Sequence, residues 1–414
     1  MNHLHREDGH LFLEGVSLED LARRYGTPLY VYSCAALDDA YRAYERALEG
    51  LPHLICYAVK ANGSLAILQH FARLGAGFDI VSGGELARVL AAGGKADKVV
   101  FSGVGKMAQE MRMALEAGIR CFNVESESEL ERLDRVAGEL GMRAPVSFRV
   151  NPDVDPKTHP YISTGLKQNK FGVPIAQAPA LYLRAAQMRN VEILGVDCHI
   201  GSQMTDLAPI SDALDRVLAL VDNLAAAGIR LRHVDIGGGV GIRYQDETPP
   251  DMAVYRNILQ SRFRGRGEEV IVEPGRSLVG EAGVLLARVE YIKAGEDRNF
   301  VIVDAAMNDL MRPSLYDAYH EIVPVTVSKA PQLVCDVVGP VCESGDFIGL
   351  GRKLAIEEGD FLAVLAAGAY GMSMSSNYNS RPRAAEVVVN KNEIFLVRER
   401  ESLEALMAGE RLVS

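Results

Sequence analysis

Short apolar runs alternate with helical patterns between residues 54 and 275 of this chain. Segments such as ELARVLAAGG and SELERLDRVAGEL repeat their apolar residues every three to four positions, which is typical of amphipathic helices. The runs between such segments are rich in β-branched and aromatic residues, as expected for buried strands. In chain order they are LICYAVKA, GFDIVS, KVVFSG, CFNVES, PVSFRVN, ILGVDCHIGS, HVDIGGG and EVIVEPG.

This alternation predicts parallel strands that are joined by right-handed helical crossovers. Eight such units fit an α/β fold of the (β/α)8, TIM-barrel type, which usually takes about 250 residues. A doubly wound sheet is the alternative, because the number of units favours the barrel without excluding an open sheet.

The pattern changes after residue 280, where few helical segments intervene. Runs such as GVLLARVEYIKAG, NFVIVDAA and AAEVVVNKNEIFLVRE are strand-like and are separated by Gly, Asp and Asn, which is typical of an all-β sandwich or barrel. The N-terminal segment holds two strand-like runs around one helix and could complete this module. We therefore expect a barrel over residues 30–280 and a β domain made of residues 1–29 and 281–414.

Composition narrows the classes of function. The formal net charge is -11 over 414 residues, which argues against a nucleic-acid partner and against an anionic membrane surface. The N-terminus MNHLHREDGH lacks the apolar stretch of a secretory signal, and no apolar run reaches the roughly 20 residues of a membrane helix. The six cysteines form no CxxC pair, so reduced thiols in a cytoplasmic protein are expected rather than a zinc ribbon.

Polar residues and glycines follow five of the predicted strands. In a (β/α)8 barrel the C-terminal ends of the strands form the active site. Any one of these positions could be structural, but their joint placement on one rim indicates a site. The positions are Lys60, Asp79, His199 with Gly201 and Ser202, Gly237 with Gly238 and Gly239, and Glu273 with Gly275 and Arg276.

Lys60 ends the first apolar run and has two interpretations: a surface lysine, or a Schiff-base lysine whose amine is activated by partial desolvation. The sequence DIGGGVG allows close approach of backbone to a ligand and favours an anion-binding nest, although a tight strand-to-helix turn is the alternative. It fits neither G-x-G-x-x-G, since Ile242 occupies the last position, nor a P-loop.

Glu273 at the end of a buried strand needs a cationic or N–H partner, which could be Arg276 or a ring nitrogen. His199 is either a satisfied core histidine or a ring stacked on a flat cofactor. An imine-forming lysine, a phosphate cradle, a carboxylate for a pyridine nitrogen and a stacking imidazole together match pyridoxal 5'-phosphate. This cofactor acts as an electron sink at the α-carbon of an amino acid.

Six motifs in family order resemble the fold-type III pyridoxal-phosphate-dependent decarboxylases, which have an alanine racemase-like barrel. Among these, the chain is most similar to the enzymes that act on diaminopimelate. The resemblance covers nearly the whole chain. The motifs are YAVKAN, HIGSQ, DIGGGVGIRY, EPGRSLVG, CESGD and GAYGMSMSSNYNSRPRAAEV.

The resemblance implies a role for each matching residue at the cofactor. Lys60 would bind the aldehyde, His199 would stack on the ring and Glu273 would pair with the pyridinium nitrogen, with Asp79 also lining the cofactor site. The remaining contacts would hold the phosphate through backbone and hydroxyl groups: Ser202, Gly237, Gly238, Gly239, Pro274, Gly275, Arg276 and Tyr370.

The resemblance also implies a substrate pocket. Arg276, Arg312 and Tyr316 would bind a distal carboxylate, with Tyr370 nearby, because guanidinium forks match a carboxylate bidentately. Glu343 would accept the distal ammonium, and Cys342 would donate a proton after CO2 leaves. The alternatives are that Arg312 and Tyr316 only line a domain interface, and that Cys342 is a small buried hydrophobe. The CESGD motif is contributed by the partner subunit in this family, so a homodimer is implied.

Two arginines and a glutamate suit a substrate tail that carries both a carboxylate and an ammonium. We therefore predict decarboxylation of meso-2,6-diaminopimelate to L-lysine and CO2, the last step of lysine biosynthesis. The alternatives are a related decarboxylase of the carboxynorspermidine, ornithine or arginine type, and a non-catalytic pyridoxal-phosphate-binding protein. Such a protein would be expected to lack Lys60 or Cys342, and both are present.

Overall fold

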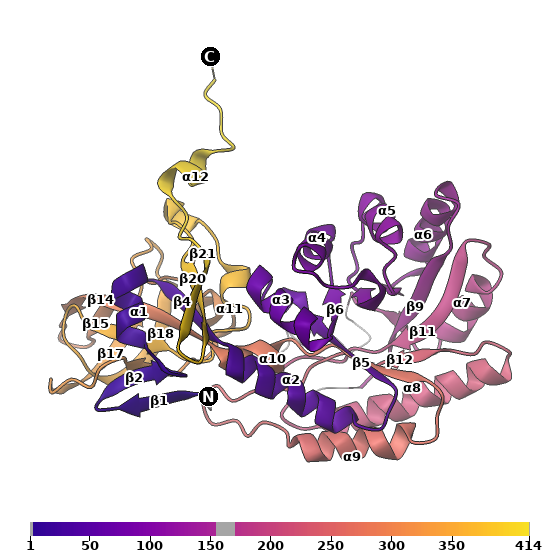
Figure 1. The fold of residues 1–414 in the computed structure, drawn as a ribbon, viewed down its shortest axis with the longest axis horizontal. Coiled ribbons are helices and arrows are strands. Elements are labelled where there is room, and N and C mark those ends of the chain that lie inside the picture. Colours follow the sequence, from indigo (N-terminus) through magenta and orange to yellow (C-terminus); the bar gives the residue numbers. More distant parts are fainter. Residues whose placement is uncertain (1–2, 155–169, 414) are drawn as a thin grey trace. The chain divides into compact units, whose positions relative to one another are not determined.

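The computed structural model describes residues 3–154 and 170–413. The chain forms two compact units, which are drawn with their elements labelled in Figure 1. The barrel unit comprises residues 41–242 and 248–277, and the β unit comprises residues 1–40, 243–247 and 278–414. The expected limits, with a barrel over residues 30–280 and a β domain of residues 1–29 and 281–414, stay a prediction.

Eight parallel strands close into a ring in the barrel unit, which confirms the predicted (β/α)8 fold. Their order is β5-β6-β7-β8-β9-β11-β12-β13, and β13 pairs with β5 to close the barrel. A short additional strand, β10 (Val173–Pro174), pairs with β9. The ring consists of β5 (His53–Ala58), β6 (Gly77–Ile80), β7 (Val99–Phe101), β8 (Cys121–Val124), β9 (Ala144–Asn151), β11 (Val191–Asp197), β12 (His233–Asp235) and β13 (Glu269–Val272).

Helices alternate with these strands and lie outside them (Figure 1). Two of these helices begin with a serine N-cap. Ser82 accepts a hydrogen bond from the backbone N–H of Glu85, and Ser126 accepts one from the N–H of Glu129. Such caps satisfy the free donors of a helix's first turn, so each helix starts at once after its strand. The helices are α3 (Leu65–Leu74), α4 (Gly83–Ala91), α5 (Ala108–Ala117), α6 (Glu127–Glu139), α7 (Ala178–Ala185), α8 (Ala208–Ala226) and α9 (Met252–Phe263).

A mixed sheet dominates the β unit, as the strand-like pattern after residue 280 predicts. Its main path runs β18-β17-β15-β14-β4-β20-β21, with β19 pairing with both β14 and β16. The sheet contains β4 (Leu29–Ser33), β14 (Gly283–Lys293), β15 (Phe300–Val303), β16 (Ile322–Pro324), β17 (Gln332–Val338), β18 (Phe347–Ala355), β19 (Phe361–Val364), β20 (Ala385–Asn390) and β21 (Glu393–Arg398).

The N-terminal segment packs into this unit. It forms a small antiparallel sheet and one helix, and two further short helices follow later in the chain. These elements are β1 (Leu4–Glu7), β2 (His10–Leu13), β3 (Val16–Ser17), α1 (Leu18–Tyr25), α11 (Arg312–Tyr316) and α12 (Leu403–Met407). Two more helices carry the chain across the limits of the units, α2 (Cys34–Leu48) and α10 (Arg276–Val279).

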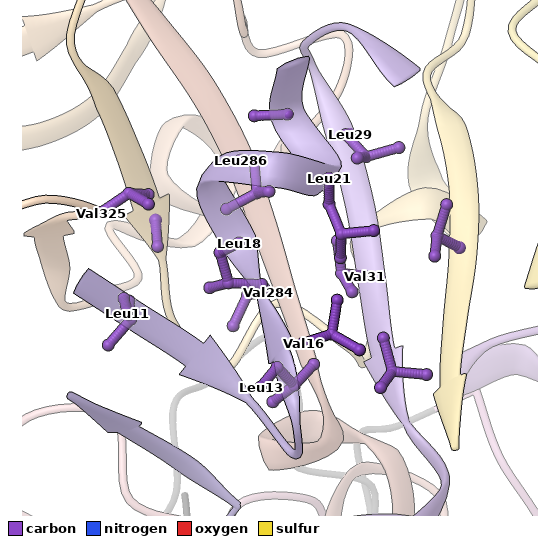
Figure 2. Close-up of a cluster of buried hydrophobic side chains, with 14 of the residues drawn as sticks. Leu11, Leu13, Val16, Leu18, Leu21, Leu29, Val31, Val284, Leu286 and Val325 are labelled. Carbon is purple, nitrogen blue, oxygen red and sulfur yellow. The ribbon is translucent and has the colours of Figure 1, made fainter. Parts of the chain in front are cut away.

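An apolar cluster joins the N-terminal segment to the main sheet (Figure 2). Leu18 and Leu21 of α1 are fully buried beside Leu29 of β4 and Val284 of β14. Truncating one such leucine to alanine typically costs about 2–5 kcal/mol. The segment that holds Leu11, Leu18 and Leu21 is therefore an integral part of the β unit.

No helix within the described residues is long and apolar enough to cross a lipid bilayer.

Candidate active site

Lys60 lies just beyond β5, in a 3-10 turn (Val59–Ala61) at the C-terminal end of the strand. Its Nζ donates to Oδ2 of Asp79 at 2.7 Å, and Asp79 is completely buried at the end of β6. The lysine side chain is 34% exposed, so the amine is partly desolvated but accessible. Because Asp79 holds the amine at one position, the nucleophile is oriented before any ligand arrives.

Glu273 follows β13 and lies in a buried polar network. Its Oε1 accepts hydrogen bonds from Asn123 Nδ2 at 3.3 Å and from Ser102 Oγ at 3.4 Å, while Asn123 also donates to Ser102 at 3.1 Å. These bonds are long and come from neutral donors, so they stabilise the ionised carboxylate only weakly. The end of β13 thus presents an acidic group that lacks a strong internal counter-charge within this network.

Two more buried carboxyl groups lie beside Glu273. Carboxylate oxygens of Asp197, Asp235 and Glu273 all lie within 4.8 Å of one another. Burial and the neighbouring acids raise the pKa of Glu273 and of Asp197 well above the usual range, and burial raises the pKa of Asp235 to about 6. Closely spaced carboxylates in a low dielectric cannot all ionise, so burial and mutual repulsion favour protonated carboxyl groups within this trio.

Arg149 of β9 supplies positive charge at the edge of this trio. Its guanidinium lies 3.2 Å from Glu125 and 3.9 Å from Asp197, and it also stacks over the ring of Phe171 at 4.7 Å. The acids around it raise the pKa of Arg149, although burial opposes them. Arg149 offsets part of the negative charge of Glu125 and Asp197, and a positively charged group bound at Glu273 would offset more of it.

The glycines after β12 allow the backbone to pass closely behind the site. A Cβ on Gly238 would lie 2.3 Å from the carbonyl oxygen of Glu273, and one on Gly239 would lie 2.5 Å from the carbonyl oxygen of Gly201. Gly237 and Gly239 also have φ values of +66° and +106°, which favour glycine. The triple glycine is therefore required by the packing of three strand ends. The turn is further fixed by the N–H of Gly237, which donates to Oδ1 of Asp235 at 2.9 Å.

His199 follows β11 and is linked to these glycines. The backbone N–H of Gly238 donates to Nδ1 of His199 at 3.1 Å, so this nitrogen is an acceptor and the imidazole proton resides on Nε2. Burial and the charges of Arg149 and Lys60 lower the pKa of His199 well below its usual value. The ring is therefore a neutral, oriented plane, as stacking on a flat aromatic ligand requires.

Ser202 and Arg276 complete the group in the barrel unit. Nη2 of Arg276 donates to Oγ of Ser202 at 3.2 Å, which leaves the serine O–H able to donate to an anion. Gly275 packs against Ala58 and Ala61, where a Cβ would lie 3.1 Å from each methyl group, and the carbonyl of Pro274 accepts the N–H of Ala58 at 3.1 Å. The structure thus brings the predicted barrel residues together at the C-terminal ends of the strands.

The remaining predicted residues belong to the β unit. Arg312 and Tyr316 are four positions apart on α11 and share one face of its single turn. The Arg312 side chain is buried, with Nη1 2.8 Å from Nε2 of His320 and the guanidinium carbon 4.4 Å from the centre of the Tyr244 ring.

Cys342 and Glu343 lie in the loop between β17 and β18, and both side chains are exposed. The Tyr378 hydroxyl donates to Glu343 at 3.4 Å, and the side-chain oxygen of Asn379 accepts the N–H of Cys342 at 3.0 Å. Cys342 is therefore exposed on this chain, and its role as a proton donor stays a prediction. Tyr370 follows β19 and has a φ of +56°, a conformation that is uncommon for a residue with a side chain.

Sequence analysis missed the partners that surround the predicted residues. Asp197, Asp235 and Asn123 lie in the apolar runs ILGVDCHIGS, HVDIGGG and CFNVES, and His320 closes the run RPSLYDAYH. An ionisable residue within an otherwise apolar strand is a detectable signal, because it must be paired or neutralised when buried. The pattern does not reveal which of these side chains share a cluster.

The residues present fit pyridoxal phosphate. Lys60 provides an accessible, oriented amine for an aldehyde, and Glu273 is a buried acid whose ionised form requires a cationic N–H such as a pyridinium. The bare backbone of Gly237 to Gly239, with the hydroxyl of Ser202, suits a phosphate.

Comparisons with known proteins agree with this geometry. Residues 35–280 match the family described as pyridoxal-dependent decarboxylase, pyridoxal binding domain. A diaminopimelate decarboxylase of Pseudomonas fluorescens is 60% identical over 406 residues, which is 98% of each chain.

Two solved structures have the same fold over nearly the whole length. Diaminopimelate decarboxylase from M. jannaschi superposes with a TM-score of 0.95 at 41% identity, covering 100% of this chain and 98% of that one. The enzyme from Helicobacter pylori, solved in complex with L-lysine, has a TM-score of 0.91 at 45% identity and covers 94% of this chain and 98% of its own.

Proposed function

Because this chain belongs to the diaminopimelate decarboxylase family of fold-type III pyridoxal-phosphate-dependent decarboxylases, we propose a role in that reaction for each residue of its site. The enzyme decarboxylates diaminopimelate to L-lysine in lysine biosynthesis, with pyridoxal phosphate as cofactor. These conclusions match the function predicted from the sequence. One observation carries these roles: buried Asp79 orients the Lys60 amine at the C-terminal ends of the barrel strands, where the buried acid Glu273 also lies.

Pyridoxal phosphate supplies an electron-withdrawing ring that accepts the electron pair left behind when CO2 departs. Lys60 would hold its aldehyde end through Nζ, and Asp79 keeps that nitrogen in position. His199 would cover one face of the ring. A neutral imidazole suits this position because it does not compete with the ring for positive charge.

Glu273 would hold the proton of the pyridine nitrogen. The carboxyl trio makes an unpaired negative charge here costly, so the ionised form of Glu273 is stabilised when a cationic N–H lies against it. The resulting ion pair keeps the ring positively charged, and a positively charged ring withdraws electrons most strongly. Asp235 and Asp197 influence this balance because their carboxylate oxygens lie within 4.8 Å of those of Glu273.

The phosphate would be bound at the turn of Gly237, Gly238 and Gly239, with the hydroxyl groups of Ser202 and Tyr370. The N–H groups of Gly237 and Gly238 donate to Asp235 and His199 and so shape this turn, which leaves the N–H of Gly239 to donate to the phosphate. The backbone from Pro274 to Arg276 would complete this cradle. Such a site binds the phosphate through hydrogen-bond donors of fixed direction rather than through flexible charged side chains, and this holds the phosphate in one orientation.

At the other end of the substrate, Arg276, Arg312 and Tyr316 would bind the distal carboxylate, and Tyr370 would line the same pocket. Glu343 would accept the distal ammonium, and Cys342 would deliver the proton that replaces CO2. A substrate tail with an ammonium alone would be repelled by two guanidinium groups, so this set favours meso-2,6-diaminopimelate over lysine, ornithine or arginine.

We also propose a homodimer in which Cys342 and Glu343 serve the site of the partner subunit. Their exposure on a loop supports this, because a proton donor and an ammonium acceptor need a surrounding pocket to act. A cytoplasmic location is proposed as well, supported by the six cysteines, all of which are free thiols.

The absorbance spectrum of the purified protein tests the role of Lys60. Wild-type protein with pyridoxal phosphate should show a band near the visible edge that is absent in Lys60→Ala. Lys95→Ala, which removes an exposed lysine in the loop before β7, is the matched control and should keep the band. An unchanged band in Lys60→Ala would assign the attachment to another amine.

A further inference from the structure

Two side chains that the roles above leave out surround the Arg312 guanidinium. His320 is completely buried at the end of the RPSLYDAYH run, and Tyr244 ends the glycine-rich motif DIGGGVGIRY. The segment 243–247 belongs to the β unit, whereas residues 242 and 248 belong to the barrel unit. Tyr244 therefore reaches Arg312 from a part of the chain about 70 residues away, and such a contact is not a consequence of local sequence.

The hydrogen bonds of His320 determine its tautomer. Nδ1 lies 2.8 Å from the carbonyl oxygen of Leu365, which can only accept, so Nδ1 carries the proton. Nε2 lies 2.8 Å from Nη1 of Arg312, which can only donate, so Nε2 accepts. The imidazole is consequently neutral and is fixed by a backbone carbonyl on one side while it holds the guanidinium on the other.

Tyr244 restrains the same guanidinium from its face. The Arg312 carbon lies 4.4 Å from the centre of the Tyr244 ring, within cation–π range. Tyr244 and His320 also pack edge to face, with ring centres 5.2 Å apart and an interplanar angle of 77°. Both groups are neutral, so they direct the guanidinium without neutralising the charge that a carboxylate would seek.

We propose that His320 and Tyr244 are positioning residues that orient Arg312 toward the distal carboxylate of the substrate. They thereby set the preference for a carboxylated over an uncarboxylated diamine. This inference rests on the proposed role of Arg312. An oriented guanidinium loses less conformational freedom on binding a carboxylate than a mobile one does. The resulting gain in affinity therefore applies only to ligands that carry a carboxylate.

Two ligands isolate the contribution of the carboxylate. L-lysine, the product, keeps the distal amino and carboxyl groups, whereas cadaverine has the same chain and both amines but no carboxylate. The dissociation constants of both are measured by calorimetry on the cofactor-loaded enzyme. The ratio of the cadaverine constant to the lysine constant reports on carboxylate recognition, and general loss of structure would weaken both ligands alike.

His320→Leu removes both hydrogen bonds and Tyr244→Leu removes the aromatic face. Each should lower the ratio about tenfold, since hydrogen bonds to charged groups and cation–π contacts have this order of effect. The conservative variants His320→Gln and Tyr244→Phe keep an acceptor and a ring, and should stay within about twofold of wild type. If His320→Leu does not fold, Tyr244→Leu and the conservative variant of each residue still test the proposal.

The variant Arg312→Leu distinguishes a failure of the positioning role of His320 and Tyr244 from a failure of the role proposed for Arg312. If Arg312→Leu abolishes the preference for lysine while Tyr244→Leu and His320→Leu leave the ratio unchanged, the positioning role is wrong and the role of Arg312 stands. If Arg312→Leu itself leaves the ratio unchanged, the assignment of Arg312 to the carboxylate is wrong. A ratio that falls equally in His320→Gln and His320→Leu would also overturn the inference, because retention of an acceptor would then not matter.

Discussion

Asp235 is the buried barrel residue whose protonation most clearly makes the stability of the fold depend on pH. It accepts the N–H of Gly237 at 2.9 Å and contacts the acids Asp197 and Glu273. Its pKa of about 6 in the folded protein lies above the value near 3.9 of an unfolded chain. The folded state therefore favours the protonated acid, and this contribution to stability is lost as the pH rises through 6.

Asp235→Asn removes that dependence while it keeps an oxygen for the N–H of Gly237. Relative to wild type, the cofactor-free variant should gain about 3 kcal/mol in its free energy of unfolding between pH 4 and pH 8, as an upper bound. Urea denaturation at several pH values measures this difference. Asp246→Asn, at an exposed position, should show no such trend. A difference between Asp235→Asn and wild type that does not change with pH would contradict the retained proton.

The sequence motifs were enough to single out Lys60, Glu273 and the triple glycine as candidate site residues. Each of them is a chemically suitable residue at the end of a predicted strand. The acidic trio and the pair around Arg312 could not be predicted in the same way. Asp197 and Asp235 are adjacent only through the pairing of β11 with β12, which juxtaposes them in register. Tyr244 meets Arg312 only through the tertiary fold. The spacing of these residues along the chain therefore reveals neither of the two contacts.

The glycine-rich turn after β12 shows how one element fixes the site. A side chain at Gly238 would collide with the backbone carbonyl of Glu273, and a backbone atom cannot move aside as the end of a flexible side chain can. The same turn places Gly238 N–H on His199. Displacing this turn would therefore move both His199 and Glu273, the residues proposed to contact the cofactor ring.

Gly238→Ala should weaken binding of pyridoxal phosphate about tenfold or more, since overpacking of this kind costs roughly 1–3 kcal/mol. Titration of the cofactor into cofactor-free protein, followed by absorbance, measures the affinity. Gly267→Ala is the matched control, because a Cβ there meets no atom within 4 Å, and it should bind normally. Equal affinities in the two variants would show that the turn does not shape the cofactor site.

At the level of elements, all eight barrel strands were predictable from apolar runs bounded by glycines and polar residues. Most of the observed strands end earlier than the runs do, whereas β9 ends with its run at Asn151. β5 stops at Ala58, and the residues after it form the turn that carries Lys60. The two-residue strand β10 gave no signal, because so short a pairing has no periodicity. Strand pairing in the β unit likewise depends on long-range partners, such as β4 between β14 and β20.

For the whole molecule, the proposed site residues are divided between two units. Lys60 belongs to the barrel unit, and Cys342 belongs to the β unit. If Cys342 serves the partner subunit, a dimer of Lys60→Ala with Cys342→Ala contains one site with both original residues and one site with neither.

Co-expression of these two inactive variants should restore about a quarter of wild-type activity, since half of randomly formed dimers are mixed and one of their two sites is intact. Sedimentation velocity on the same samples establishes the assembly. Activity no higher than that of the separate variants, in a protein that forms dimers, would place both residues in the same subunit.

The release of L-lysine and CO2 from meso-diaminopimelate, with pyridoxal phosphate added, is the decisive assay of the reaction and of its substrate. Lysine, ornithine and arginine serve as competing substrates in parallel assays. We expect equal amounts of L-lysine and CO2 from diaminopimelate, loss of both in Lys60→Ala, and slower turnover of the other three amino acids. Faster turnover of any of these, or no release while the cofactor remains bound, would contradict the account.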